Sequence, residues 1–175
     1  MCGLIAGIGK VSLATLDKAV TTLTHRGPES SATWVSDNQS MFLGHTRLSI
    51  IGLDNGAQPI SNADGNVHIV VNGEFYGYKD IRNRLLSEGV AFKTESDSEI
   101  ALHLYLRYGL QALKELRGEF SIVIADERQN CLIAIRDRFG IKPLFYTIHQ
   151  GAVYFASEIK ACLLYTSPSP RDQAK

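Results

Sequence analysis

Apolar residues along this chain recur with two spacings, one typical of strands and one typical of helices. Short apolar or alternating runs, often bounded by Gly, Asn or Asp, predict strands. Longer segments with apolar residues every three or four positions predict amphipathic helices. The strands are expected at residues 4–8, 32–36, 41–44, 47–51, 67–71, 120–125, 131–136, 144–148 and 153–156, and the helices at residues 13–24, 78–88, 96–108 and 110–116.

The order of these elements predicts the fold class. Most links between the expected strands have the length of a hairpin, and strands rarely alternate with helices. Ser96 and Glu99 have the spacing of a capping box, which marks the start of the third helix. A polar loop is expected at residues 54–65. The pattern favours an α+β protein in which antiparallel sheets carry helices on their outer faces.

Composition narrows the class of protein without identifying a function. The 175 residues are expected to form one domain. Lys plus Arg and Asp plus Glu both number 18, so bulk charge gives no reason to expect a nucleic acid or membrane partner. Cys2, Cys131 and Cys162 fit neither a disulfide framework nor a zinc pattern, which favours a reducing, cytoplasmic location. We recognise no signal peptide and no apolar run long enough to span a membrane.

The C-terminal end differs from the rest of the chain. Residues 166–172 read Thr-Ser-Pro-Ser-Pro-Arg-Asp, a stretch that cannot continue a helix and has little to bury. We therefore expect the folded domain to span residues 1–162. Residues 163–175 are expected to be a non-native extension or a disordered native linker.

Cys2 is the strongest candidate for chemistry. Removal of Met1 would leave a thiol and a free α-amine on the same residue, so that the amine could accept the thiol proton and later return it to a leaving group. An α-amine has an ordinary pKa of about 8, which suits this exchange near neutral pH. The simpler interpretation is that Cys2 begins a buried strand as a small apolar residue.

Three later positions could supply the other parts of a site. Arg47 could bind a substrate carboxylate with two hydrogen bonds, or could be a surface residue. Asn72 and Gly73 could donate hydrogen bonds to an oxyanion, although Asn-Gly is also a common hairpin turn. Asp97 could hold a ligand ammonium group or help to cap a helix. Together with the Cys2 thiol, these groups are those needed to hydrolyse the side-chain amide of a free amino acid.

Seven stretches carry a resemblance to a known family. The chain resembles the N-terminal glutaminase domain of glutamine-hydrolysing asparagine synthetases, which are class II, or N-terminal nucleophile, glutamine amidotransferases. The similarity covers roughly residues 1–162, and the seven stretches occur in the family's order. They are Met1-Cys2-Gly3, His25-Arg26-Gly27-Pro28, residues 44–50, Asn72-Gly73-Glu74, Ser96-Asp97-Ser98-Glu99, residues 136–144 and residues 155–160.

This resemblance implies a fold and a set of roles. The fold would be a four-layer αββα sandwich. Cys2 would be the nucleophile after loss of Met1, and Asn72 with Gly73 would form the oxyanion hole. The substrate would be L-glutamine, with its α-carboxylate and α-ammonium held by Arg47 and Asp97. The remaining lining of the glutamine pocket would come from Leu48, Ser49, Ile50, Ile51 and Glu74.

The chain also departs from the family pattern. Phe75-Tyr76-Gly77 follows Asn72-Gly73-Glu74 where the family usually continues with a hydrophobic residue, Tyr and Asn, and Glu119 replaces a more usual Met. The family's C-terminal synthetase domain, with its Ser-Gly-Gly-x-Asp-Ser phosphate loop, does not occur in this sequence. The resemblance implies that ATP and Mg²⁺ belong to that missing partner domain and that this domain needs no cofactor. It leaves open a homodimer of the full-length protein.

Two other functions remain open from the sequence. One is the same glutaminase chemistry supplying a different acceptor, as in glucosamine-6-phosphate synthase or the purine-pathway amidotransferase. The other is a catalytically silent module that binds glutamine without turnover. The joint presence of Cys2, Arg47, Asn72, Gly73 and Asp97 argues against the silent module.

Overall fold

The computed structural model describes residues 1–9, 13–48 and 56–166. Two antiparallel sheets and four α-helices form its regular structure within those residues. The strands are β1 (Gly3–Ile8), β2 (Ser30–Val35), β3 (Met41–Arg47), β4 (Ile60–Ser61), β5 (Val67–Phe75), β6 (Gly118–Asp126), β7 (Cys131–Arg136), β8 (Phe145–His149) and β9 (Ala152–Ala156). The helices are α1 (Leu13–Thr22), α2 (Tyr78–Ser87), α3 (Glu99–Tyr108), the 3₁₀ helix η1 (Leu110–Glu115) and α4 (Ile159–Thr166).

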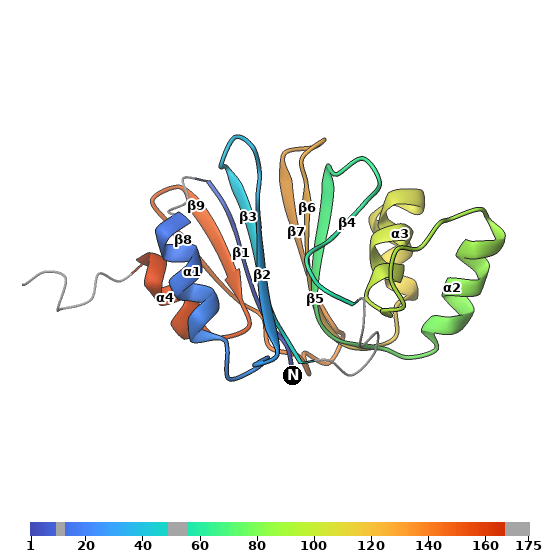
Figure 1. Ribbon diagram of the computed structural model, residues 1–175, viewed down its shortest axis with the longest axis horizontal. Coiled ribbons are helices and arrows are strands. Elements are labelled where there is room, and N and C mark those ends of the chain that lie inside the picture. The colour runs from blue at the N-terminus through green and yellow to red at the C-terminus, as the bar shows by residue number, and fades with distance from the viewer. Residues whose placement is uncertain (10–12, 49–55, 167–175) are drawn as a thin grey trace, which may run out of the picture.

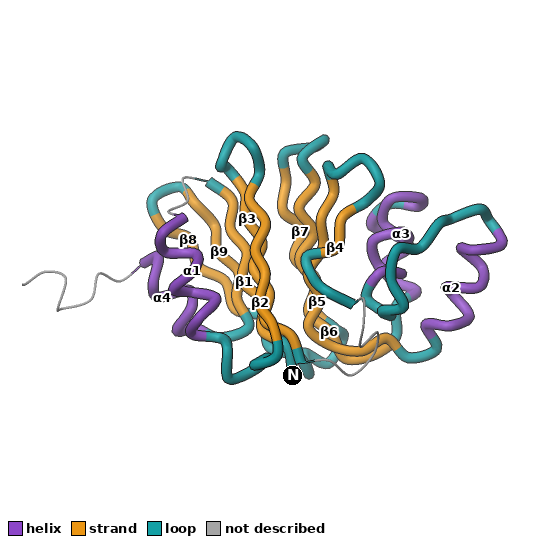
Figure 2. Tube along the Cα trace, viewed as in Figure 1, coloured by secondary structure: helices purple, strands orange, loops and turns teal. Residues whose placement is uncertain are grey.

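The two sheets lie face to face between helices. One sheet has the strand order β2-β3-β1-β9-β8, and the other has the order β4-β5-β6-β7. Helices α1 and α4 cover the outer face of the first sheet, and α2 and α3 lie on the outer side of the second (Figure 1). The tube view shows the same succession of helices, strands, strands and helices (Figure 2). The expected α+β, four-layer αββα sandwich is confirmed.

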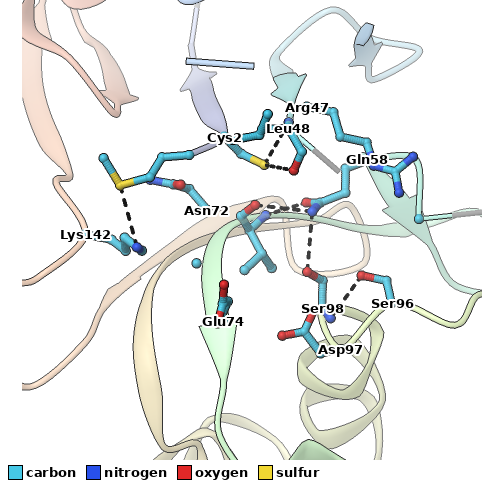
Figure 3. Close-up of a pocket in the computed structure, with 14 residues that line it drawn as sticks. Cys2, Arg47, Leu48, Gln58, Asn72, Glu74, Ser96, Asp97, Ser98 and Lys142 are labelled. Carbon is cyan, nitrogen blue, oxygen red and sulfur yellow. Dashed lines mark hydrogen bonds between the residues drawn. The ribbon is translucent and has the colours of Figure 1, made fainter. Parts of the chain in front are cut away.

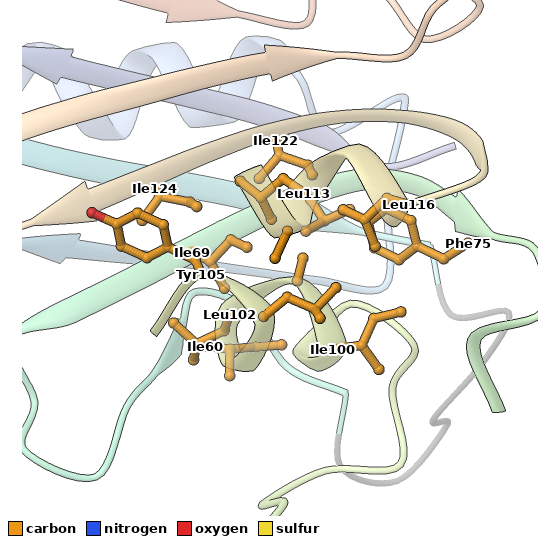
Figure 4. Packing of buried hydrophobic residues seen from close by; sticks show 14 of the residues in the cluster. Ile60, Ile69, Phe75, Ile100, Leu102, Tyr105, Leu113, Leu116, Ile122 and Ile124 are labelled. Carbon is orange, nitrogen blue, oxygen red and sulfur yellow. The ribbon is translucent and has the colours of Figure 1, made fainter. Parts of the chain in front are cut away.

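Alternating side chains on the strands produce three separate hydrophobic layers. On β1, Leu4 and Ala6 point between the sheets, whereas Ile5 points towards the helices of its own sheet. On β5, Val70 belongs to the layer between the sheets. The layer beneath α3 is the largest, and Ile100 and Leu102 of that helix are fully buried in it (Figure 4). Because each central strand is covered on both faces, the sheets form a rigid base for groups at their ends.

Strand β5 corrects one expectation from the sequence. The strand was expected to stop at Val71, but it continues through Asn72 and Gly73 to Phe75 and pairs along its whole length with β6. The Asn-Gly pair is therefore not a hairpin turn. Gly73 has a φ of 147°, and a β-carbon there would lie 2.0 Å from the Glu119 carbonyl oxygen of the neighbouring strand. Glycine is required at this position because the two strands approach so closely.

Three further elements differ from expectation. Two strands were expected at residues 41–44 and 47–51, but the structure has one continuous strand, β3, which ends at Arg47. Residues 49–51 lie outside the described part. Strand β4 occurs within the expected loop, where it pairs with β5. Helix α4 was not expected, because the Ser/Pro stretch that follows led us to assign residues 163–175 to a tail.

Helix α4 crosses the domain boundary that we expected at residue 162. Its last turn carries Tyr165, whose ring stacks on Phe42 and Tyr154 at centroid distances of 5.6 and 4.3 Å. Residues up to Thr166 thus belong to the packed structure. The rest of the expected tail lies outside the described residues.

The start of α3 also differs in detail from the capping box. The Glu99 carboxylate does not reach back to Ser96 but accepts hydrogen bonds from the backbone N–H groups of Lys93 and Thr94, at 2.8 and 2.7 Å. This ties the helix to the preceding loop and thereby places residues 96–98 at the end of the second sheet. No helix in the described part of the chain is long and apolar enough to cross a membrane.

Replacement of Gly73 by alanine tests the close approach of β5 and β6. Gly73→Ala is expected to destabilise the fold by several kcal/mol, because the new methyl group meets backbone and the φ angle is unfavourable for an L-residue. Gly65→Ala is the matched control: Gly65 also has a positive φ, of 68°, but no atom lies within 4 Å of its virtual β-carbon. That variant is expected to lose only about 1 kcal/mol. Equal losses in urea unfolding would contradict the steric argument.

Candidate active site

Side chains from three other elements hold the backbone of the first residues of β1. The Gly3 N–H donates to Thr46 Oγ1 at 3.1 Å, and the Leu4 N–H donates to Ser157 Oγ at 3.0 Å. Arg26, which follows α1, donates from Nε to the carbonyl oxygen of Cys2 at 3.0 Å. Cys2 therefore has a fixed backbone although it lies one residue from the chain terminus.

The thiol of Cys2 lies against the backbone of Leu48. The Leu48 N–H donates to Cys2 Sγ at 3.4 Å, and the thiol donates to the Leu48 carbonyl oxygen at 3.6 Å. The backbone of Leu48 thus holds the sulfur in place through both its N–H and its carbonyl oxygen. Cys2, Cys131 and Cys162 are all free thiols. Burial raises the pKa of Cys162 to about 11, so that thiol is a poor nucleophile.

Two polar side chains, one of them from the facing sheet, contact the backbone of Val71 on β5. Nε2 of the buried His45, on β3, lies 3.1 Å from the Val71 carbonyl oxygen on β5. Gln58 accepts a hydrogen bond from the Val71 N–H at 2.6 Å and donates to the same carbonyl at 3.2 Å. Burial, together with the charge of Arg47, outweighs the hydrogen bond to Val71 and lowers the pKa of His45 to about 4. His45 is therefore neutral near pH 7 and acts as a hydrogen-bond donor between the sheets.

Asn72 presents a buried amide without a partner. The side chain is 1% exposed, and neither Oδ1 nor Nδ2 has a hydrogen-bond partner among the described residues. Leaving a buried polar group unpaired costs about 1–3 kcal/mol. Asn72 also lines the pocket that contains Cys2 (Figure 3). An amide that is costly to bury and lies at a pocket wall indicates the position of a ligand's polar atoms.

Asp97 provides a buried carboxylate on the opposite side of the pocket. It is 4% exposed and accepts a hydrogen bond from the Phe75 N–H at 2.9 Å. Burial raises its pKa, and the nearby negative charge of Glu74 adds to this, although backbone N–H groups partly oppose the shift. Glu74 lines the same pocket. Two neighbouring carboxylates favour a cationic group between them.

The pocket brings together most of the residues expected from the sequence. Cys2, Leu48 and Arg47 lie on one side, and Asn72, Glu74 and Asp97 come from the second sheet and the start of α3 (Figure 3). Gly73 also lines it. Ser49, Ile50 and Ile51 lie outside the described residues, so their expected contribution stays a prediction.

Several lining residues were missed by sequence reasoning. Besides Gln58, the pocket wall includes Ser96, Ser98 and Lys142. Lys142 is 8% exposed, and its Nζ lies 3.1 Å from Glu119 Oε1 and 3.6 Å from Met1 Sδ. Lys142 was missed because the family resemblance implies only a structural role for residues 138–143. Glu119, which replaces the more usual Met of the family, provides the ion-pair partner of Lys142.

The loop that carries Lys142 is organised by one carboxylate. Asp137 accepts hydrogen bonds from the backbone N–H groups of Phe120, Phe139, Ile141 and Lys142. Burial by itself would raise the pKa of Asp137, but these donors outweigh it and lower the pKa. In the described part of the chain, no group of three or more His, Cys, Asp or Glu side chains could hold a metal ion. The expectation that this domain needs no cofactor stays a prediction.

The described residues form a sandwich of two antiparallel sheets, with a thiol next to the start of the central strand β1 and an unpartnered amide on the facing sheet. The chain belongs to the glutamine amidotransferase domain family, whose profile matches residues 1–174.

Curated relatives carry this domain as part of longer proteins. The chain is 44% identical over 160 residues to amidase chry2 of Gibberella zeae, covering 91% of this chain and 24% of the relative. It is 39% identical over 171 residues to asparagine synthetase [glutamine-hydrolyzing] 1 of Bacillus subtilis, covering 94% of this chain and 27% of the relative. The chain thus spans about a quarter of the length of these relatives.

A solved structure confirms the fold at lower identity. The glutamine phosphoribosylpyrophosphate amidotransferase of B. subtilis, complexed with ADP and GMP, superposes with a TM-score of 0.78 at 23% sequence identity. The match covers 91% of this chain and 42% of that protein. At this identity the likeness establishes the architecture alone.

Asp97→Asn tests the cost of the buried carboxylate. Because the folded-state pKa is raised, the charged form opposes folding at pH values above it, and this cost disappears as the pH falls towards the unfolded value of about 4. Asparagine can still accept the Phe75 N–H. The variant is therefore expected to have a higher free energy of unfolding than the wild type at pH 7, with the difference shrinking under acid conditions.

Asp126→Asn is the control, for which we expect the opposite change in the free energy of unfolding. The Arg128 guanidinium outweighs burial and, with Tyr105, lowers the pKa of Asp126 to about 2. Its charge therefore stabilises the fold above the unfolded pKa, and this contribution is lost as the pH falls towards 2. Asp126→Asn is expected to destabilise the protein at pH 7. Destabilisation of the same size by both substitutions would contradict the conclusion that burial of the Asp97 charge opposes folding.

Proposed function

We propose that this domain hydrolyses L-glutamine to glutamate and ammonia, with Cys2 as the nucleophile once Met1 is removed. The observation that carries the proposal is the unpartnered, buried Asn72 amide in the pocket of the Cys2 thiol. An amide Nδ2 group in such a place can donate to the oxyanion of a tetrahedral intermediate. Membership of the glutamine amidotransferase domain family supports glutamine as the substrate.

The reaction needs no group outside the pocket. The α-amine of Cys2 takes the thiol proton while sulfur forms a bond to the side-chain amide carbon of glutamine. The resulting oxyanion accepts hydrogen bonds from Asn72 Nδ2 and the Gly73 N–H. The C–N bond then breaks, and the proton on the amine passes to the departing ammonia. Water attacks the thioester in the same way, releasing glutamate and restoring the thiol.

The charged side chains around the pocket suit the rest of the substrate. Arg47 would bind the α-carboxylate, and Asp97 with Glu74 would bind the α-ammonium group. The raised pKa of Asp97 supports this role, since a bound cation would relieve the cost of the buried charge. Leu48, through its backbone, keeps the thiol next to the substrate's side-chain amide.

The names of the relatives, rather than this pocket, support a proposal for the destination of the ammonia. Several relatives at 37–39% identity are named glutamine-hydrolysing asparagine synthetases. We therefore infer that the domain supplies ammonia to a C-terminal synthetase domain that uses ATP and Mg²⁺. The 44% identity to two fungal amidases keeps another acceptor open as the alternative. The three free thiols support a cytoplasmic location.

The nucleophile is tested by glutamate release from the wild type and from Cys2→Ala, with the N-terminus of each checked by intact mass. We expect the wild type, after loss of Met1, to release glutamate and ammonia in equal amounts, and Cys2→Ala to release neither. Cys131→Ala is the control cysteine and is expected to keep full activity. Activity in Cys2→Ala, or in protein that retains Met1, would contradict the proposed mechanism.

The role of Asn72 is tested by a substitution that separates stability from activity. Asn72→Leu is expected to lower kcat by about 10²–10³-fold through loss of an oxyanion donor. Its melting temperature is expected to be unchanged or higher, because two unpaired buried polar atoms are removed.

Asn62→Leu is the matched control for Asn72→Leu. Asn62 is also buried, but its side chain hydrogen-bonds to Asn66 and to the Val67 N–H. This control is expected to lower the melting temperature while the folded protein keeps its kcat. A fall in melting temperature for Asn72→Leu, with kcat retained, would show that Asn72 is structural.

A further inference from the structure

An ion-paired cluster joins the start of α4 to the backbone of the candidate nucleophile. Glu158, immediately before α4, lies with its Oε1 3.2 Å from Arg26 Nη1 and 2.8 Å from His25 Nε2. Its second oxygen, Oε2, lies 3.1 Å from Lys160 Nζ. Arg26 in turn donates from Nε to the Cys2 carbonyl oxygen at 3.0 Å. A chain of contacts thus runs from Glu158 through Arg26 to Cys2.

These contacts hold the backbone of Cys2, which lies beyond the residues that strand pairing holds. The pairing of β1 with β9 begins at Ile5 and Ala156, so Cys2 lies beyond the last residue pair on that side. On the β3 side the pairing begins one residue after Cys2, at Gly3. Hydrogen bonding to the Cys2 carbonyl therefore depends on the Arg26 side chain rather than on a neighbouring strand.

Arg26 can hold that carbonyl only if its guanidinium is itself oriented. Its side chain is 10% exposed, and its Nη2 is buried without a partner among the described residues. The Glu158 carboxylate is the acidic partner that the structure gives Arg26 within those residues. Burial would raise the pKa of Glu158, but the His25, Lys160 and Arg26 donors outweigh it and lower the pKa to about 2. Glu158 is thus ionised across the neutral pH range.

We propose that Glu158 is a positioning residue for the reaction: by orienting Arg26, it fixes the carbonyl of Cys2 and so the direction of the thiol and α-amine of the same residue. The inference rests on the proposed function of Cys2. Without the carboxylate, the Cys2 peptide could rotate and carry the thiol and amine away from the substrate. A small misplacement of a reacting group costs up to about 10²-fold in rate. Because neither Glu158 nor Arg26 is among the residues that line the pocket with the proposed substrate anchors, the loss falls on kcat.

A purely structural role predicts a different outcome. A negative charge just before a helix stabilises that helix, so Glu158 could serve α4 alone. In that case its removal would lower the melting temperature and the fraction of folded protein, while each folded molecule kept its full kcat. The positioning role predicts a folded protein whose nucleophile works slowly.

The test compares Glu158→Ala and Glu158→Gln in the full chain, with active sites counted by a glutamine-like affinity label. We expect Glu158→Ala to lose about tenfold in kcat per labelled site, with KM for glutamine within about twofold of the wild type. We expect Glu158→Gln to recover most of this loss, because its amide oxygen can still accept from Arg26. The rate of Cys2 alkylation by iodoacetamide, mapped by peptide mass, should follow the same order.

Glu115→Gln is the matched control. Glu115 pairs with Arg84 at 2.7 Å on the surface, where the two side chains are 45% and 43% exposed. This variant is expected to keep both kcat and the alkylation rate. Unchanged kcat per site and unchanged Cys2 alkylation in Glu158→Ala would overturn the inference. Absence of glutamate release by the wild type would instead overturn the proposed function, and the alkylation rates would still decide the role of Glu158.

Discussion

The hydrogen bonds that hold the backbone of residues 2–4 are the constraint on which the site depends. A nucleophile at a chain terminus has almost no preceding backbone to fix it, so its position must come from contacts with other elements. Thr46, Ser157 and Arg26 supply these contacts from β3, from the residue after β9 and from the turn after α1. Together they turn a strand end, which would otherwise fray, into a rigid support.

The two sheets then bring complementary groups to the same end of the sandwich. The first sheet carries the thiol and Arg47, and the second carries Asn72, Gly73 and Glu74 at the end of β5. His45 crosses between the sheets to the Val71 carbonyl, one residue before Asn72. The distance between the proposed nucleophile and the proposed oxyanion donors is thus set by packed strands rather than by loops. A site that stabilises a transition state needs this kind of preorganisation.

Local patterns predicted much of the fold, and non-local contacts explain what they missed. Short apolar runs located β1, β6 and β9 to within two residues at either end, because these strands are largely buried. From the sequence, Asn72-Gly73 could be either a hairpin turn or a pair of hydrogen-bond donors for an oxyanion. The close approach of Glu119 on β6 excludes the turn. That approach joins residues nearly fifty positions apart and leaves no mark in the local sequence.

The same limit applies to the site. The resemblance to a family indicated Cys2, Arg47, Asn72 and Asp97, and the structure places all four around one pocket. It did not indicate Lys142 or the contact between Glu158 and Arg26, which are 132 positions apart. Such partners become visible only when the fold brings them together.

The central claim is that Cys2, as the first residue, forms a covalent intermediate with glutamine. The most direct measurement is an acid quench of the protein during turnover, followed by intact mass and peptide mapping. The account predicts a γ-glutamyl thioester on an N-terminal peptide that begins with Cys2 and lacks Met1. Glutamate release without an adduct on Cys2, or with the adduct on Cys131 or Cys162, would contradict it.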